Sequence, residues 1–400
     1  MARVWAGVDA GKTRHHCVVI DADGKKLLSR RVASDEPELL ALIGDVTALG
    51  EATWAAGLPD GGAALLIGLL LEAGQELLYI PGRAVNRAAA SYRGEGKTDA
   101  RDAAVIADQA RMRRDLQPLR PGDELTAELK LLTARRRDLV ADRTRAISRL
   151  RELLTSIFPA LERALGELKA AGPLTLLTGF QTPAAIREAG PEALEGWLRQ
   201  RGVRNAGKLA AAACEAAARQ HAVLPAEKLT AQLAAGLAGE VIALNEQVRE
   251  MDKLIEDRFH RHELAPVIES MPGTGPLLGA EFLAATGGDM SFFGTPDRLA
   301  GFAGLAPAPR DSGRIRGNLH RPERCHRVLN RVFYHSAMVS ITCPEESRAF
   351  YDRKRAEGKK HTQAVLALAR RRVNVLWALI RDKRAYQARP PRHAATQEAS

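Results

Sequence analysis

The sequence contains few aromatic residues, few cysteines and no long apolar run. Aromatic residues make up 4% of the 400 residues, so a surface that binds bases mainly by stacking is not expected. The four cysteines include no Cys-x-x-Cys pair, which argues against a zinc site or a disulfide framework and favours a reducing cytoplasm. No signal peptide is recognised, and the most apolar stretch, residues 65–80, is too short and too polar to cross a bilayer. We therefore expect a cytoplasmic protein without membrane contact.

The formal net charge of +11 is concentrated in the last third of the chain. Residues 1–118 contain 15 Lys/Arg and 16 Asp/Glu, residues 119–270 contain 22 and 21, and residues 271–400 contain 22 and 11. A basic region beside a carboxylate-bearing one suggests a nucleic-acid enzyme. A basic surface that only confers solubility is the alternative.

Residues 1–118 have the pattern of an α/β domain. Three β-rich runs with a turn at residues 21–24 predict an antiparallel meander. Helix and strand patterns then alternate as far as Pro81-Gly82, where the last strand is expected to stop. This order is typical of a ribonuclease-H-like fold, in which a first-strand Asp and later helix carboxylates converge on one site. The predicted runs are strands at 3–8, 16–20, 26–32, 52–56 and 76–80, and helices at 37–49 and 61–73.

Three carboxylates of this domain are candidate metal ligands. Asp9 lies near the end of the first predicted strand, and Asp99 and Asp102 lie three residues apart on one face of a predicted helix at 99–112. Carboxylate oxygens bind Mg²⁺, or the similar Mn²⁺, together with water and substrate phosphate. Two such cations about 4 Å apart could assist phosphodiester cleavage. The alternative is a solvated acidic turn, with Asp99 as a helix N-cap.

Residues 119–268 are predicted to be helical and elongated. An Arg-rich helix pattern covers 125–165 and is expected to kink or end at Pro159. A small helical insert at 173–220 precedes a second long helix with a coiled-coil-like seam, which favours a structural or oligomeric role. The predicted seam contains Leu229, Leu233, Leu237, Val241, Leu244, Val248, Met251 and Ile255.

Residues 269–384 are predicted to form a mainly helical domain, followed by a disordered tail at 385–400. The glycine-rich segment 271–276 before a helix at 277–285 resembles the hairpin of a helix-hairpin-helix element, which binds phosphate through backbone amides. An apolar loop at 302–309 leads into a polar loop containing Ser312, and further helices are expected at about 324–341 and 359–381. A serine beside several arginines could attack phosphorus, although a serine in a polar turn is the plainer interpretation.

These motifs, in this order, resemble the insertion-sequence one-ten family of transposases over nearly the whole chain. The matching segments are Gly7-Val-Asp9, Trp54–Leu58 with Gly61-Gly62, Tyr92–Ala103, Met271–Gly275, Gly304–Pro307 and Arg310–Arg314. The resemblance implies a RuvC-like domain with four acidic residues and a C-terminal transposase domain that supplies a serine. It assigns Asp9, Asp99 and Asp102 as the first, third and fourth acids and Ser312 as the nucleophile. Where the second acid is expected, this chain has Gly57 instead, and Asp60 is the candidate for the second acid.

The resemblance also implies partners. Members of the family recombine donor and target DNA as assemblies of several subunits, here a dimer or tetramer, guided by a structured RNA encoded at the element's end. The expected location is the bacterial cytoplasm, at the nucleoid. The residues expected to contact nucleic acid are Lys12, Arg101, Gly273, Thr274, Gly275, Arg310, Arg314 and Arg316.

Our interpretation is a DNA transposase that cuts and rejoins DNA through a Mg²⁺-assisted serine. Two alternatives stay open. One is a hydrolytic junction-resolving nuclease that uses the carboxylates and water, and the other is a catalytically weakened nucleic-acid-binding relative, which Gly57 suggests.

Overall fold

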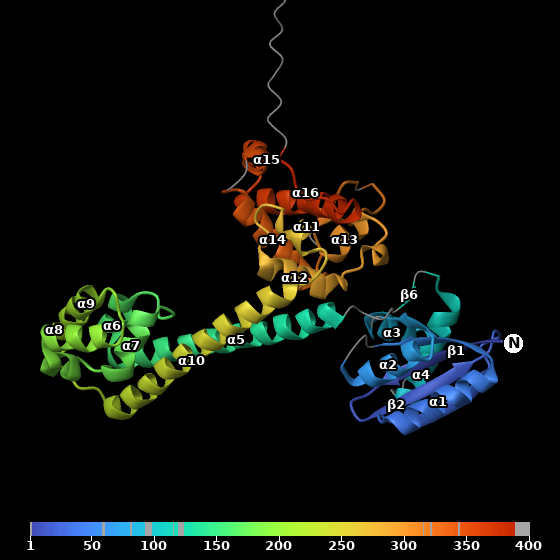
Figure 1. Ribbon diagram of the computed structural model, residues 1–400, viewed down its shortest axis with the longest axis horizontal. Coiled ribbons are helices and arrows are strands. Elements are labelled where there is room, and N and C mark those ends of the chain that lie inside the picture. Colours follow the sequence, from blue (N-terminus) through green and yellow to red (C-terminus); the bar gives the residue numbers. More distant parts are fainter. Residues whose placement is uncertain are drawn as a thin grey trace, which may run out of the picture. The chain divides into compact units, whose positions relative to one another are not determined.

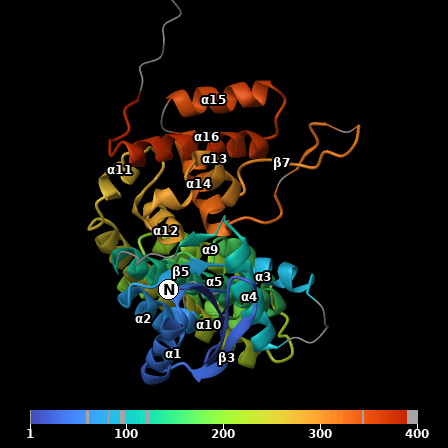
Figure 2. The same ribbon diagram turned by 90° about the vertical axis from the view of Figure 1, so that its right-hand side faces the viewer.

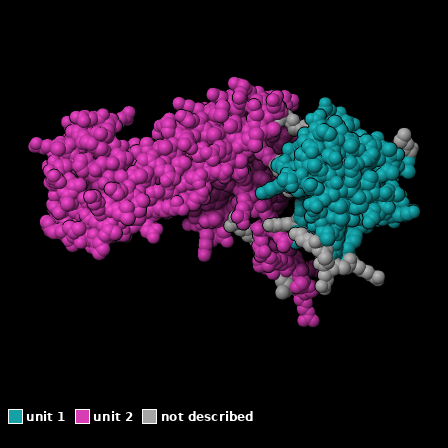
Figure 3. Space-filling model, turned by 90° about the horizontal axis from the view of Figure 1, so that it is seen from below, with its two compact units in different colours: residues 1–122 teal, residues 123–400 magenta. Residues whose placement is uncertain are grey.

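The chain forms two compact units, residues 1–122 and 123–400 (Figure 1 and Figure 3). The computed structural model describes residues 2–57, 61–80, 82–92, 98–114, 116–118, 124–314, 316–320, 322–342 and 345–388. Within these ranges no helix has the length and hydropathy needed to cross a membrane.

The N-terminal unit is a mixed α/β domain with a six-stranded sheet in the order β3-β2-β1-β4-β5-β6. Strands β1, β2 and β3 form the predicted antiparallel meander, β4 and β5 run parallel to β1, and β6 is antiparallel to β5. The strands are β1 Arg3–Ala10, β2 Arg14–Ile20, β3 Lys26–Ala33, β4 Glu51–Ala56, β5 Glu76–Tyr79 and β6 Gln117–Pro118. The helices are α1 Glu36–Leu49, η1 Gly61–Ala63, α2 Ala64–Glu72, α3 Gly82–Ala89 and α4 Asp99–Met112. The sequence analysis did not predict α3 or β6.

The alternation of β1 side chains separates two layers of helices. Val4, Ala6 and Val8 pack in the core that includes buried residues of α1 and α2. The residues between them face α4: a Cβ on Gly7 would lie 2.2 Å from the carbonyl oxygen of Ala103. The same alternation therefore turns the side chain of Asp9 toward α4.

The second unit is helical and is built on two long helices, α5 Glu124–Ile157 and α10 Glu227–Phe259, which pack along one another (Figure 1). The predicted break at Pro159 is confirmed, because α5 ends at Ile157 and α6 begins at Pro159. The predicted insert is a helical cluster that shares one apolar core with the second half of α5 and the first part of α10. Its helices are α6 Pro159–Leu165, α7 Ala171–Gly179, α8 Pro183–Gln200 and α9 Ala206–Ala218.

The seam of α10 differs from the predicted one in its first half. Leu229 and Leu233 are 59% and 54% exposed, whereas Ala231, Ala234 and Ala238 are buried. Alanine at these positions leaves room for the neighbouring helix backbone, so the small residues form the contact and the leucines face outward. From Val241 onward the predicted seam residues are buried or packed against the core.

A separate apolar core joins the beginning of α5, the end of α10 and the C-terminal helices. The predicted helices near 277–285, 324–341 and 359–381 are confirmed, while α15 was not predicted. Tyr386 lies in the segment expected to be disordered, yet its backbone N–H donates to Ser270 Oγ at 2.8 Å; residues 389–400 lie outside the described ranges. The elements are α11 Ala265–Glu269, α12 Pro276–Thr286, η2 Met290–Phe292, α13 Pro296–Phe302, β7 Ala308–Pro309, β8 Leu319–His320, α14 Arg327–Ser340, α15 Glu345–Ala356 and α16 His361–Arg381. Figure 2 shows α14, α15 and α16 grouped together in the C-terminal part.

Candidate functional site

Two of the predicted carboxylates line one cavity in the N-terminal unit. Asp9, at the C-terminal end of β1, and Asp102, in the first turn of α4, line a space of about 250 Å³. The rest of its wall comes from Ala10, Gly57, Gly82, Val85, Asn86 and Ile106. The cavity therefore brings together carboxylates that are more than ninety residues apart in the sequence.

The local structure explains why these two side chains meet. Thr98 is the N-cap of α4, and its hydroxyl accepts from the backbone N–H of Arg101 at 3.2 Å, which fixes where the helix starts. Gly7 has no side chain, so the backbone of α4 approaches the sheet closely beside Asp9. With the helix start and its distance from β1 both fixed, Asp102 falls opposite the end of the strand.

The other predicted acids contribute differently. Asp99 is the first residue of α4 and is exposed; it does not line the cavity, although it shares a helix face with Asp102. Asp60 lies outside the described residues. Gly57 directly follows β4 and lines the cavity, so the departure from the family pattern lies at the site itself.

Asn86 is a polar cavity residue that the sequence analysis missed. It lies on α3, which begins at Gly82, where the sequence predicts only the end of a strand. Its side-chain amide could bind a phosphate oxygen. A polar residue two turns from the end of a strand is too weak a signal to select from sequence.

The two cations predicted near this site have different surroundings. Lys12 is exposed in the turn between β1 and β2 and remains a candidate phosphate contact. The Arg101 guanidinium instead donates to the backbone carbonyls of Ala89 and Tyr92, at 3.2 Å and 3.0 Å. These bonds tie the chain after α3 to α4 and give Arg101 a structural role, while its contact with phosphate stays a prediction.

A tyrosine beside this contact is tied to the same helix. The Tyr92 hydroxyl donates to Asp108, which also pairs with Arg111. Burial, and then the Asp108 carboxylate, raise the pKa of Tyr92, because both disfavour the phenolate. Tyr92 therefore remains a neutral donor at neutral pH.

The cavity suits a hard divalent cation with an incomplete protein shell. Within the described ranges, no group of three His, Cys, Asp or Glu side chains is arranged to hold a metal ion. Mg²⁺, however, is commonly held by one or two carboxylates, with water and substrate phosphate completing its shell. Asp9 and Asp102 therefore fit Mg²⁺ or Mn²⁺ that is shared with a bound phosphate.

Ser312 lies in the second unit, in the loop that joins β7 to β8. Asp311 accepts from the backbone N–H of Asn318 at 3.0 Å, and the Arg310 N–H donates to the Asn318 carbonyl at 2.9 Å, which closes the loop at its base. Ser312 is exposed. So are Arg310, Arg314 and Arg316, and only Arg310 among these three has an ion pair within the described part, with Glu323 at 3.0 Å. The loop therefore presents a hydroxyl among cationic side chains.

The glycine-rich turn before α12 does not present Thr274 to a ligand. Thr274 is 4% exposed, its N–H donates to Met271, and its hydroxyl lies 2.9 Å from that of Ser336 on α14. A Cβ on Gly273 would lie 2.6 Å from the Ser336 carbonyl oxygen, so the turn packs inward. Thr274 therefore has a structural role in the turn, and its contact with nucleic acid stays an untested prediction; Gly275 is exposed and remains a candidate.

A buried arginine holds the same turn. The guanidinium of Arg372, on α16, donates to Ser336 Oγ at 2.7 Å and to the carbonyl of Pro272. Burial lowers the pKa of Arg372 to about 10, so it is still charged at neutral pH. Arg372 therefore joins α16, α14 and the turn through hydrogen bonds.

Comparison with known proteins identifies the class and then the family. A profile described as "Transposase" matches residues 6–159, which contain Asp9 and Asp102, and places the chain among the transposases. A second profile, "Transposase IS116/IS110/IS902 family", matches residues 265–352, and the chain belongs to this family. Membership implies DNA as the substrate and cleavage and rejoining of DNA as the activity.

Three relatives illustrate the range of similarity. The chain is 60% identical to the insertion element IS900 uncharacterized 42 kDa protein of Mycobacterium paratuberculosis, over 99% of each chain. It is 51% identical to the insertion element IS116 uncharacterized 44.8 kDa protein of Streptomyces clavuligerus, over 97% of each. It is 28% identical to the mini-circle putative transposase for IS117 of Streptomyces coelicolor, over 90% of each.

Proposed function

We propose that this transposase cuts and rejoins DNA with a serine nucleophile and a carboxylate-bound divalent cation. The observation that carries the proposal is the convergence of Asp9 and Asp102 on one cavity. The order β3-β2-β1-β4-β5 supports a ribonuclease-H or RuvC-like fold for residues 1–118, in which β1 supplies the first acid. Residues 119–268 would then be a coiled-coil region, and residues 269–384 the transposase domain that carries Ser312.

In this proposal the carboxylates hold the cation, and basic side chains contact the DNA backbone. Asp9 and Asp102 hold Mg²⁺ or Mn²⁺, with Asp99 and Asp60 as further candidate ligands. The cation would neutralise charge on the scissile phosphate and stabilise the leaving oxygen. Lys12 contacts the DNA backbone nearby. The arginines at 310, 314 and 316 stabilise the charge that develops on phosphorus.

The chemical step is a transesterification. Ser312 Oγ attacks phosphorus, the Oγ–P bond forms, and the bond from phosphorus to the leaving deoxyribose oxygen breaks. The serine proton passes to a base, and the leaving oxygen takes up a proton as it becomes a hydroxyl. The reverse reaction, with a hydroxyl of a new DNA end, rejoins the strand and releases the serine, so no nucleotide cofactor is consumed.

The assembly and the guide are parts of the same proposal. The paired helices α5 and α10 would contribute to a dimer or tetramer, and the Ser312 loop of one protomer would act with a carboxylate site of its own or another protomer. A structured RNA would select donor and target DNA by base pairing, and the protein would contact shape and backbone. The low aromatic content supports this division, since stacking on bases needs aromatic side chains.

Trapping the ester tests this proposal. Labelled DNA that contains an element end is incubated with the protein, the structured RNA encoded at that end and Mg²⁺, quenched in detergent and examined for a protein–DNA adduct. The wild type should form an adduct that maps to Ser312, and Ser312→Ala should form none. Asp9→Asn and Asp102→Asn should each lower adduct formation by at least about a hundredfold, as expected when a metal ligand is lost. Undiminished cleavage by Ser312→Ala would favour the hydrolytic nuclease.

Gly57 favours a second candidate, a weakened relative that binds nucleic acid without efficient cleavage. Position 57 lines the cavity, yet it supplies no ligand. An adduct formed by the wild type would exclude this candidate.

A further inference from the structure

The pairing of β1, β2 and β3 extends the face of the sheet that carries Asp9. Asp9 lies directly opposite His16 of β2, and His16 lies directly opposite Arg31 of β3. Side chains that are directly opposite in antiparallel strands are on the same face of the sheet. Asp9, His16 and Arg31 therefore form a row across three strands, from the carboxylate cavity to the edge strand β3.

The neighbours of His16 identify this face as the one that α4 covers. Val18 and Ile20 pack in one core with residues of α4, whereas Cys17 packs in the core on the other side of the sheet. His16 alternates with Cys17 and so shares the face of Val18 and Ile20. A hydrogen bond of 3.0 Å between His16 Nε2 and Ser29 Oγ holds the ring on this face.

Two consecutive arginines of β3 lie on opposite faces of the sheet. Arg30 is on the side of α1, where it pairs with Glu38 at 3.6 Å and with Asp45. Arg31 is on the side of Asp9 and is exposed, and its side chain has no ion pair or hydrogen bond among the described residues. The charge of Arg30 is therefore neutralised within the protein, and that of Arg31 is not.

Arg14 adds a second cation to the face of Arg31. It is the first residue of β2, two positions before His16, so both side chains are on the same face. Arg14 is exposed, and its side chain also lacks an ion pair in the part of the chain that the structure describes. An arginine without a carboxylate partner can donate a pair of parallel hydrogen bonds to a phosphate. The sheet thus has basic side chains directly beside an acidic cavity.

The spacing of the row suits a strand of DNA. Neighbouring strands of a sheet lie about 4.8 Å apart, so β3 is about 10 Å from β1. A DNA strand rises about 3.4 Å per nucleotide, so this span corresponds to about three linkages. When one phosphate lies at the cavity of Asp9, the phosphates that follow it along the strand can reach the two arginines.

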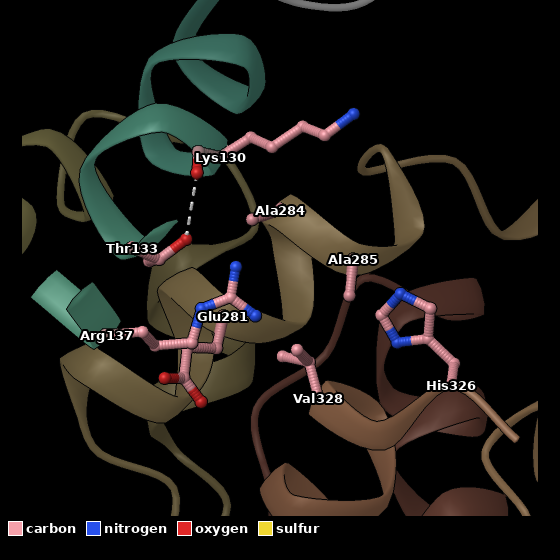
Figure 4. A pocket seen from close by; sticks show the side chains of 8 residues that line it. All are labelled: Lys130, Thr133, Arg137, Glu281, Ala284, Ala285, His326 and Val328. Atoms are coloured by element: carbon pink, nitrogen blue, oxygen red, sulfur yellow. Dashed lines mark hydrogen bonds between the residues drawn. The ribbon is translucent and has the colours of Figure 1, made fainter. Parts of the chain in front are cut away.

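A continuous polymer needs an exposed surface of this kind. The pocket in the helical unit, between α5, α12 and the start of α14, has a volume of about 90 Å³ and is lined in part by Arg137, Glu281 and His326 (Figure 4). A water molecule occupies about 30 Å³, so this pocket holds about three waters. It does not admit a nucleotide, whereas the row beside Asp9 is open at the edge of its sheet.

We infer that Arg31 and Arg14 bind phosphates of the DNA strand within about three linkages of the linkage that is cleaved. The inference rests on the proposed function, since it takes the cavity of Asp9 as the place of the scissile phosphate. His16 lies between Asp9 and Arg31 and separates the bound phosphate from the carboxylate. Contacts of this kind position the strand without reading its sequence.

The salt dependence of DNA binding tests the two contacts without cleavage. A labelled duplex that contains an element end is titrated with the full-length protein in the Ser312→Ala background, together with the structured RNA encoded at that end. Arg31→Gln and Arg14→Gln should each raise the Kd about fivefold to tenfold and lower the slope of log K against log salt by up to about 0.9, the value for one phosphate.

Arg30→Gln is the matched control, because it removes the same charge from the adjacent residue on the opposite face. It should change the Kd by less than about twofold and leave the slope unchanged, since the charge of Arg30 is already paired. If Arg31→Gln and Arg14→Gln behave like Arg30→Gln, the two arginines do not contact DNA and the inference is overturned.

Methylphosphonate linkages identify the phosphate that is bound, because each replaces one charged phosphate oxygen by a methyl group. Single substitutions are scanned across the element end. At the linkage that Arg31 contacts, substitution should weaken binding about fivefold to tenfold for the parent protein and for Arg30→Gln, but less than about twofold for Arg31→Gln, whose contact is already lost. A general loss of structure would weaken binding of every duplex and would not abolish the effect at one linkage.

The remaining outcomes separate this inference from the proposed function. If Arg31→Gln weakens binding of the RNA alone and not of the DNA, the contact is with RNA and the inference is overturned. Sensitive linkages more than about three from the cleaved one would also overturn it. If the wild type forms no Ser312 adduct, the proposed function fails, and the salt slopes still measure whether the two arginines bind DNA.

Discussion

Replacing Gly57 by aspartate tests whether the N-terminal cavity is a metal site. Among the described residues, a Cβ at position 57 would have one neighbour within 4 Å, the Cδ1 of Ile106 at 3.7 Å, which is an ordinary van der Waals contact. The backbone at Gly57 is outside the left-handed region, so a side chain is tolerated there. Gly57→Asp therefore adds a third carboxylate beside Asp9 and Asp102 without a steric cost.

Gly57→Asp should lower the unfolding temperature in the absence of metal and increase its response to Mg²⁺. Two carboxylates about 5 Å apart at an effective dielectric constant of about 20 repel by about 3 kcal/mol. In EDTA, Gly57→Asp should therefore unfold at a lower temperature than the wild type. A cation present at about 100 times its Kd contributes about 2.7 kcal/mol, which corresponds to roughly 10 °C for a domain of this size. Mg²⁺ should accordingly raise the midpoint of Gly57→Asp more than that of the wild type.

Differential scanning calorimetry with EDTA or Mg²⁺ measures both effects, and Gly57→Asn is the matched control because it adds the same volume without charge. The same variants are then compared in the adduct assay, where Gly57→Asp should exceed the wild type. If Mg²⁺ raises the midpoints of Gly57→Asp and Gly57→Asn equally, position 57 adds no ligand. If Mg²⁺ raises the midpoint of neither variant, the cavity does not bind the cation and the carboxylate proposal is refuted.

Three further predictions concern packing and pH. Gly7→Ala places a Cβ 2.2 Å from a carbonyl oxygen and 2.3 Å from a backbone nitrogen of α4, so it should destabilise the N-terminal unit by more than about 3 kcal/mol. The control Gly44→Ala has open space around the new Cβ inside α1 and should stabilise the unit by about 0.5–1 kcal/mol. Calorimetry measures both changes in stability. His15 is buried, both ring nitrogens are without hydrogen-bond partners within the described part of the chain, and burial lowers its pKa, so its folded-state pKa lies below the unfolded value of 6.5. The contribution of His15 to stability is complete above pH 6.5 and should fall by up to about 1.4 kcal/mol per pH unit as the pH drops below 6.5. In urea unfolding, His15→Leu should not show this dependence of stability on pH. If His15→Leu and the wild type depend on pH equally, His15 is not buried in its neutral form. Arg372→Met removes the donor to Pro272 and Ser336 and should lower the free energy of unfolding by about 2–3 kcal/mol in urea unfolding. The control Arg371→Met, at an exposed position on the same helix, should change it by less than about 0.5 kcal/mol.

The sequence was sufficient for the features that depend on local periodicity. The three-stranded meander, the start of α4 at Asp99 and the break at Pro159 follow from strand alternation, helix spacing and proline geometry, and all three are observed. The convergence of Asp9 and Asp102 was also predictable, because a strand end and a helix start of this fold order meet at one edge of the sheet.

Features that depend on how surfaces fit together were not predictable. Leucines and alanines on α10 both recur at helical spacing, and only the packing of α10 in the core shared with α5 and the insert helices makes the alanines the buried set. Thr274 lies in a turn whose composition is typical of phosphate binding, but its partner Ser336 is 62 residues further along the chain. The pocket of Arg137, Glu281 and His326 combines residues from three distant segments, and none of them has a local motif.

The contact at Gly7 has a consequence for how this domain can change in evolution. Where a helix rests on a sheet through side chains, a new side chain shifts the helix and any group it carries. Here the main chain of α4 rests directly on the main chain of β1, with Ala103 and Ala107 as the points of support. The gap between Asp9 and Asp102 is therefore set by atoms that every amino acid shares, so exchanges of apolar residues that leave this main-chain contact intact preserve the spacing of the two acids.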